Sequence, residues 1–186
     1  QIEADSILEL KNRINEDFEK AIEILYNCKG RVIVTGMGKS GHIGKKIAAT
    51  LSSTGTPSYF LHPAESTHGD SGLITRNDVV IAISNSGETE ELKATAMAIK
   101  NNGCKIIAVT GKSDSWLGKY GEVCLFAGVN AEGGPLNRAP RASILAETYV
   151  LQCLSVILQE TSNITPEEYV KRHPGGSLGK LREGEY

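Results

Sequence analysis

Apolar residues are distributed along the chain in two patterns. Five short runs are almost continuously apolar and rich in β-branched residues, which is typical of strands buried on both faces of a sheet. These runs are residues 31–35, 58–61, 79–83, 105–110 and 123–126. Elsewhere apolar residues recur every three or four positions, as on one face of a helix. The helices predicted from this spacing are residues 5–27, 42–53, 89–99, 115–120 and 143–159.

The alternation of strands and helices predicts an α/β fold, a doubly wound parallel sheet of five strands with helices on both faces. Thr165–Glu168 forms a capping box with proline at the first helical position, which predicts one more short helix ending before Pro174. Residues 62–70 are predicted to form a polar loop. The loop 127–141 is too long for a simple connection, which indicates a functional role. The length of 186 residues suits one domain, residues 1–186, without internal repeats.

The strand at 79–83 runs directly into a turn rich in hydroxyl groups, Ser84-Asn85-Ser86-Gly87-Glu88-Thr89, and a helix follows. This order directs backbone N–H groups, the positive end of the helix dipole and three hydroxyls toward one point, which suits a phosphate group without a metal ion. Gly87 lets the backbone approach a ligand closely. The alternative is a turn that only caps the helix, but a cap needs one hydroxyl and not three. The turn is therefore predicted to bind phosphate.

A second glycine-containing turn, Gly36-Met37-Gly38-Lys39-Ser40-Gly41, follows the strand at 31–35. Its glycine spacing matches the dinucleotide fingerprint, yet the second strand ends at Leu61-His62-Pro63 without the acidic residue that would bind the ribose. A Walker A loop is excluded because its first glycine would fall on Ile33. Both turns lie at carboxyl ends of strands, where ligands of such sheets bind. A small phosphorylated metabolite is the ligand that this pair of turns favours.

Charge and composition narrow the class of protein further. The net charge is −2, so no basic field favours nucleic acid or anionic lipid, and no apolar run reaches the roughly 18 residues of a membrane span. The four cysteines are far apart in the sequence, which favours free thiols in a cytoplasmic protein. His62, His68 and Asp70 match no standard metal-ligand spacing, so neither a metal nor another cofactor is expected.

Taken together, the motifs resemble the sugar isomerase (SIS) domain and, within that family, the arabinose-5-phosphate isomerases. The likeness spans nearly the whole chain and rests on Gly36–Gly41, His62-Pro63, His68-Gly69-Asp70, Ser84–Thr89 and His173-Pro174-Gly175-Gly176. It implies interconversion of D-arabinose 5-phosphate and D-ribulose 5-phosphate through an enediol, the first step in the synthesis of Kdo (3-deoxy-D-manno-octulosonate) for lipopolysaccharide or capsule. It also implies a homotetramer with sites shared between subunits. Many members carry a pair of CBS domains, which these 186 residues do not contain.

The resemblance nominates five catalytic residues: Lys39, His68, Glu91, Glu132 and His173. Glu132 is the expected carbon base, and His173 is expected to open the sugar ring and move protons between its oxygens. Lys39 would hold the enediolate, Glu91 would orient a neighbouring group, and His68 would close the site. Each also has an ordinary role available, as a solvated charge, a helix-end residue or a charge at a loop tip.

Three further residues, Gly38, Ser40 and Arg141, are expected to contact the substrate. Arg138 and Arg141 make the loop around Glu132 more basic than in the resembling family, which suggests feedback by the anionic end product CMP-Kdo. Equally, both arginines could face solvent or pair with nearby acids. Two other functions stay open: isomerisation of another sugar phosphate, and a non-catalytic phosphosugar sensor, which would need neither Glu132 nor His173.

Overall fold

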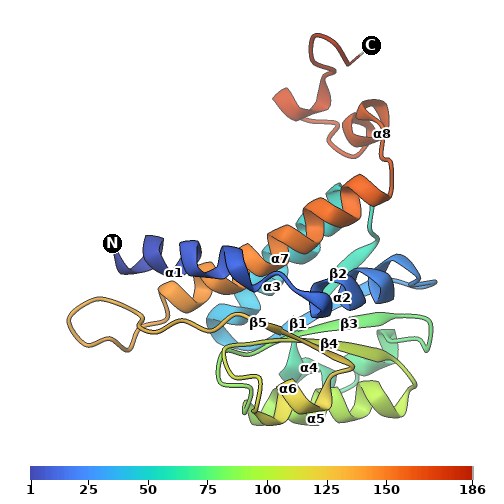
Figure 1. Cartoon of the computed structure of the whole chain (residues 1–186). Coiled ribbons are helices and arrows are strands. Elements are labelled where there is room, and N and C mark those ends of the chain that lie inside the picture. The colour runs from blue at the N-terminus through green and yellow to red at the C-terminus, as the bar shows by residue number, and fades with distance from the viewer. Residues whose placement is uncertain (186) are drawn as a thin grey trace.

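A computed structural model describes residues 1–185 and contains one parallel sheet. The strands are β1 (Val32–Gly36), β2 (Ser58–Leu61), β3 (Val79–Ile83), β4 (Lys105–Thr110) and β5 (Val123–Phe126). They pair in the order β2-β1-β3-β4-β5 (Figure 1). The predicted doubly wound α/β fold is confirmed, and each strand begins and ends within one residue of its predicted limits.

Helices cover both faces of this sheet (Figure 1). One face carries α1 (Ile2–Leu10), α2 (Glu16–Tyr26), α3 (Gly38–Ser53) and α7 (Ala142–Thr161). The other carries α4 (Pro63–Ser66), α5 (Glu90–Asn101) and α6 (Trp116–Tyr120), while α8 (Pro166–Lys171) follows α7. Short 3₁₀ helices occupy Lys11–Arg13, Asp70–Leu73 and Ser177–Gly179.

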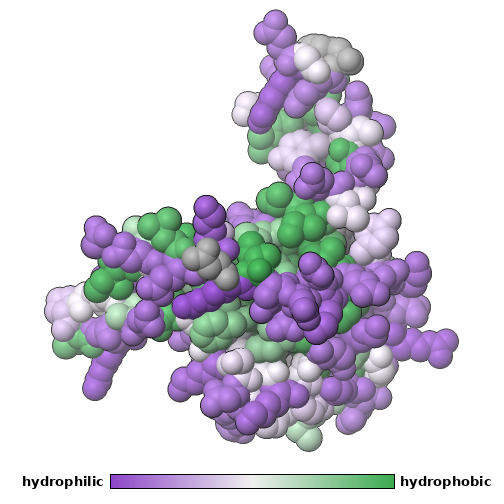
Figure 2. Space-filling view, in the orientation of Figure 1, coloured by the Kyte–Doolittle hydropathy of each residue, from purple (hydrophilic) through white to green (hydrophobic). Residues whose placement is uncertain are grey.

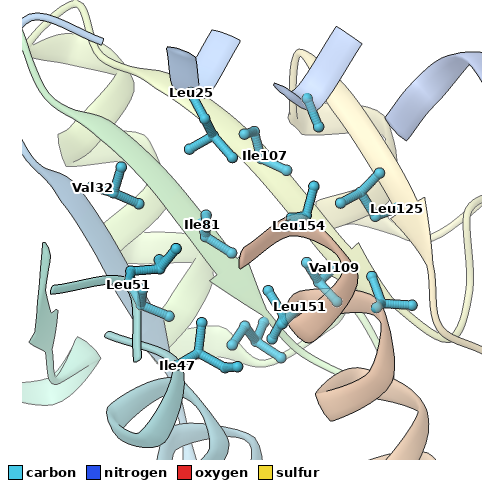
Figure 3. Packing of buried hydrophobic residues seen from close by; sticks show 14 of the residues in the cluster. Leu25, Val32, Ile47, Leu51, Ile81, Ile107, Val109, Leu125, Leu151 and Leu154 are labelled. Atoms are coloured by element: carbon cyan, nitrogen blue, oxygen red, sulfur yellow. The ribbon is translucent and has the colours of Figure 1, made fainter. Parts of the chain in front are cut away.

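The core consists of two layers because successive strand residues point to opposite faces. Ile81 and Ile107 face α3 and α7, whereas Val80 and Ile106 face the α5 side, and all four are buried. Figure 3 shows the first layer, in which side chains of α3 and α7 pack over the central strands. Burial on both faces explains why the strands are continuous apolar runs in the sequence.

The prediction of one continuous helix over residues 5–27 is wrong, because this segment contains two α-helices, α1 and α2, with a break between them. The chain turns to extended geometry at Ile14 (ψ 114°), and Asn15 then caps α2 by accepting a hydrogen bond of 3.0 Å from the backbone N–H of Asp17. The helix after β1 begins at Gly38 and not at His42. The predicted polar loop 62–70 contains α4 and the start of a 3₁₀ helix.

The 20 residues of α7 span about 30 Å, so this helix crosses the whole sheet. This helix is long and apolar enough to match a membrane span, although half of its apolar stretch is buried, as in the core helix of a folded domain. The capping box of α8 is confirmed. Figure 1 shows α8 and the residues after it beyond the far end of α7, standing apart from the sheet.

Candidate functional site

A cavity of about 310 Å³ lies at the carboxyl ends of β1 and β3. These neighbouring strands lead into α3 and α5, which cover opposite faces, so the cavity occupies the point where the winding direction reverses. Its lining consists of Met37, Lys39, Ser40, Ile83, Ser84, Asn85, Ser86, Thr89, Pro140, Ser143 and Ile144. Both glycine-containing turns singled out in the sequence therefore meet at one site.

The turn after β3 is braced from within by Ser84. This residue is only 4% exposed, and its hydroxyl accepts the backbone N–H of Gly87 at 3.1 Å and lies 3.0 Å from Thr89 Oγ1. Thr89 occupies the N-cap position of α5 but makes no side-chain cap bond. The capping alternative therefore fails, because the hydroxyls shape the turn and leave the first N–H groups of α5 without a side-chain partner.

Gly87 is required at the centre of this turn. Its φ of +67° lies in the left-handed region, and an added Cβ would collide with the Ser115 side chain at the start of α6. The turn is thus held against the β4–α6 connection, with Asn85 and Ser86 exposed toward the cavity. Besides the predicted close approach of a ligand, which stays a prediction, Gly87 permits close packing of the turn against Ser115.

The turn after β1 brings a second helix terminus to the cavity. Gly36 and Gly41 allow tight packing, because a Cβ on Gly41 would collide with the Gly36 carbonyl oxygen. Met37, the N-cap residue of α3, provides no side-chain cap. Lys39 lies on the first turn of α3, is exposed, and forms no ion pair with any residue among 1–185. Two helix N-termini without side-chain caps and one unpaired cation therefore border the same space, which favours an anion.

Glu132 lies beside the cavity and anchors the start of α7. Its Oε2 accepts the backbone N–H groups of Arg141 at 2.7 Å and Ser143 at 3.1 Å. Partial burial raises the pKa of Glu132, but hydrogen bonds from Ser143, Arg141 and Ala142 outweigh it and hold the pKa below its ordinary value. The carboxylate is thus ionised at neutral pH, next to Ser143 of the cavity wall.

A residue that sequence reasoning missed, Glu147, lies under the cavity. It is fully buried on α7, and its Oε1 accepts a hydrogen bond of 2.9 Å from the Ser40 hydroxyl. Burial raises its pKa to about 7; the Ser40 hydrogen bond opposes this rise and the charge of Glu132 adds to it. The sequence feature that could have revealed Glu147 is its place as the single acid on the apolar face of the 143–159 helix, one turn after Ser143.

The remaining predicted residues are distributed more widely. Gly38 and Arg141 adjoin the lining without belonging to it, and Glu91 is exposed on the first turn of α5. His68 is exposed after α4, near the edge strand β2. His173 lies beyond α8, where its ring stacks on Tyr169 with centroids 4.1 Å apart.

His173 is therefore far from the cavity of its own chain. The cavity lies at the N-terminal end of α7, whereas α8 follows its C-terminal end about 30 Å away. Another hollow, of about 330 Å³, lies near α8, but the helix terminus there is already capped by the Thr165 side chain. No group of three or more His, Cys, Asp or Glu side chains that could hold a metal occurs in the described part of the chain.

The fold and the site define an α/β domain with a cavity at its topological switch point, bordered by two helix N-termini and a lysine. A profile of the SIS domain matches residues 24–156, and the chain belongs to the SIS domain family. The expected family resemblance is thereby confirmed.

Among curated relatives, arabinose 5-phosphate isomerase KdsD of Pseudomonas aeruginosa is 50% identical over 179 residues, which cover 96% of this chain and 55% of the relative. The KdsD enzyme of Escherichia coli K12 is 45% identical with the same coverage. The chain thus spans about half the length of these curated relatives. The solved structure of Escherichia coli CFT073 c3406 in complex with arabinose 5-phosphate superposes with a TM-score of 0.89 at 37% identity, covering 92% of each chain.

Proposed function

We propose that the protein is an aldose–ketose isomerase that interconverts D-arabinose 5-phosphate and D-ribulose 5-phosphate through an enediol. The observation that carries this proposal is the single cavity joining two uncapped helix N-termini to Lys39 and, at its edge, to the ionised Glu132. One part of that cavity suits a phosphate dianion and the other suits proton transfer at a carbonyl. Similarity to KdsD enzymes and to a structure in complex with arabinose 5-phosphate supports the choice of pentose phosphate.

In this proposal Asn85, Ser86 and the N-terminus of α5 hold the phosphate, on the turn that Ser84, Gly87 and Thr89 shape. The Lys39 ammonium stabilises the negative charge that develops on the enediolate oxygens. Glu132 moves the proton between C1 and C2, for which it must be ionised, and the helix-terminal N–H groups keep it so. Ser40 and Gly38 contact the substrate from the α3 turn.

The other catalytic candidates act from the rim or from another subunit. Glu91, on the first turn of α5, orients a group next to the phosphate, and His68 closes the site from the β2 side. His173 serves the site of a partner subunit, because α7 separates it from its own cavity by about 30 Å. Sharing of sites in this way supports a homotetramer.

An apolar surface supports the same assembly. Ile14, Phe18, Ile22 and Tyr26 of the α2 region line a groove of about 350 Å³ with Ile157 of α7. Figure 2 shows apolar residues gathered on this side of the molecule. Light scattering at micromolar concentration is expected to give the mass of a tetramer, whereas a monomeric mass would exclude a site shared between subunits.

We place the reaction in the cytoplasm, as the first step of Kdo synthesis. All four cysteines are free thiols, which fits a reducing compartment. Feedback by CMP-Kdo would act through Arg138 and Arg141, which are exposed and form no ion pair among the described residues. The test compares inhibition by CMP-Kdo in wild type and in an Arg138→Ala/Arg141→Ala variant. Loss of inhibition in the variant is expected, and equal inhibition of both proteins would remove the arginines from the proposal.

The proposed activity is tested by incubating the purified protein with a panel of aldose and ketose phosphates of five to seven carbons in the presence of EDTA. Conversion is followed by NMR in deuterated water, which also reports exchange of the C2 proton. Arabinose 5-phosphate is expected to react fastest, with deuterium entering at C2. Preference for another sugar phosphate would replace arabinose 5-phosphate as the proposed substrate. Binding without conversion would indicate a phosphosugar sensor and not an isomerase.

A further inference from the structure

A fully buried carboxyl group, that of Glu147, lies beside the cavity. It is 0% exposed, and its neighbours on α7, Ala146 and Leu151, belong to the hydrophobic core. Burial of an acid in such surroundings is unfavourable unless it is hydrogen-bonded. Its one partner is the Ser40 hydroxyl at 2.9 Å, contributed by a residue 107 positions earlier in the chain.

Ser40 connects this acid to the cavity. It lies on the first turn of α3, next to Lys39, and it belongs to the cavity lining. A serine hydroxyl donates one hydrogen bond and can accept two. Because its proton is directed to Glu147 Oε1, its lone pairs are available to a hydroxyl group bound in the cavity.

An unpartnered polar atom marks the same place. Glu147 Oε2 is buried without a hydrogen-bond partner. It lies one helical turn from Ser143, which lines the cavity and whose hydroxyl is directed toward Glu132. Buried polar atoms are almost always paired in folded proteins, so Glu147 Oε2 leaves room for a partner that enters from the cavity.

We infer that Glu147 is a positioning residue of the isomerisation, which holds Ser40 at the cavity wall and exchanges a proton with a substrate oxygen through its hydroxyl. A substrate hydroxyl passes its proton to Ser40 Oγ while the serine proton passes to Glu147 Oε1. One O–H bond of the substrate breaks, one O–H bond forms on the carboxylate, and no electrons are transferred. The reverse step returns the proton to the other substrate oxygen, which restores the carboxylate after each turnover. This inference rests on the proposed function.

The electrostatic surroundings suit such an exchange. Burial raises the pKa of Glu147 to about 7, so that the protonated and ionised forms are both populated near neutrality. The α3 side contributes only the Ser40 hydroxyl, and the charge that acts on Glu147 among the described residues is that of Glu132 in the preceding loop. Glu132, which is ionised, thus moves the proton between the substrate carbons. Glu147, whose pKa is near neutrality, exchanges the proton with the substrate oxygens through Ser40.

The test compares Glu147→Gln, Ser40→Ala and the double variant, with Glu160→Gln as the matched control, an exposed acid on the same helix. Values of kcat and KM are measured from pH 5.5 to 9. Each single variant is expected to lose about 10²-fold in kcat with little change in KM, and to lose the ionisation near neutral pH from the kcat profile. The double variant is expected to be no slower than the slower single variant, because the two residues act as a unit.

Glu147→Asp, which retains an ionisable carboxyl group, is expected to restore part of the pH dependence. An unchanged kcat profile in Glu147→Gln, or losses that multiply in the double variant, would overturn the inference. If Glu147→Gln does not fold, the Ser40→Ala variant tests the inference instead, because it removes the hydrogen bond between Ser40 and Glu147 and keeps the Glu147 carboxyl group. A wild-type protein that isomerises no sugar phosphate overturns the proposed function, and the inference with it. An active wild type with unaffected variants overturns the inference alone.

Discussion

Replacement of Gly87 by alanine tests whether the turn after β3, which is proposed to bind phosphate, is held by close packing as well as by backbone geometry. The φ of Gly87 is +67°, where an alanine costs about 1–2 kcal/mol. Its Cβ would also meet both Oγ and Cβ of Ser115, so rotation of the hydroxyl cannot relieve the overlap. Ser115 is itself fixed, since it caps α6 by accepting the N–H of Gly118. Forced overpacking adds about 1–3 kcal/mol.

Gly38 provides the matched control for this variant. Its φ of +55° is similar, but nothing lies within 4 Å of the position its Cβ would take. Gly38→Ala is therefore expected to lose only the backbone term of about 1–2 kcal/mol, and Gly87→Ala about 2–5 kcal/mol. Urea denaturation at fixed protein concentration measures both free energies of unfolding, and phosphosugar titration measures the accompanying loss of affinity.

The double variant Gly87→Ala/Ser115→Gly separates the two contributions. Removal of the Ser115 side chain clears the overlap but loses the side-chain cap of α6, which for a glycine at this position costs only about 0.3 kcal/mol. A positive coupling between the two sites is expected, such that the double variant is more stable than the sum of the single effects predicts. Equal destabilisation by Gly87→Ala and Gly38→Ala, together with zero coupling, would refute the packing explanation.

Three further outcomes are expected. Ser86→Ala is expected to weaken phosphosugar binding about 10–150-fold, because a charge-assisted hydrogen bond contributes about 1.5–3 kcal/mol. No loss of stability is expected, because the side chain is exposed. Unchanged affinity by calorimetry would exclude Ser86 from the proposed phosphate site. Glu132→Gln is expected to retain binding but to lose about 10²–10⁴-fold in turnover and in C2 proton exchange, and near-normal exchange would assign the carbon base elsewhere. Because the pKa of Glu147 is raised to about 7 in the folded protein, from 4.5, the unfolded chain ionises first and stability falls as pH rises through this window. Wild type is expected to lose about 2–3 kcal/mol more than Glu147→Gln between pH 5 and pH 8, as urea denaturation measures, and parallel pH dependences would show that Glu147 titrates normally.

The five strands and the two glycine-containing turns could be predicted from the sequence alone. Continuous β-branched runs such as 79–83 and the capping box at Thr165 are local signals, readable because backbone geometry and side-chain type are coupled over a few residues. The location of the site at the carboxyl edge followed from the parallel order of the strands. The break at Ile14 was missed because the helical spacing of apolar residues continues across it.

Only the tertiary structure decided how polar groups pair across the fold. Ser84 braces its own turn, and Ser40 and Glu147 meet across 107 positions of sequence at the junction of α3 and α7. No local pattern encodes such a contact, because it depends on how two helices pack on one face of the sheet. The same holds for His173, whose distance from its own cavity is set by the length and direction of α7. Burial, and with it the pKa of Glu147, is a property of the packed molecule and not of the amino-acid sequence around it.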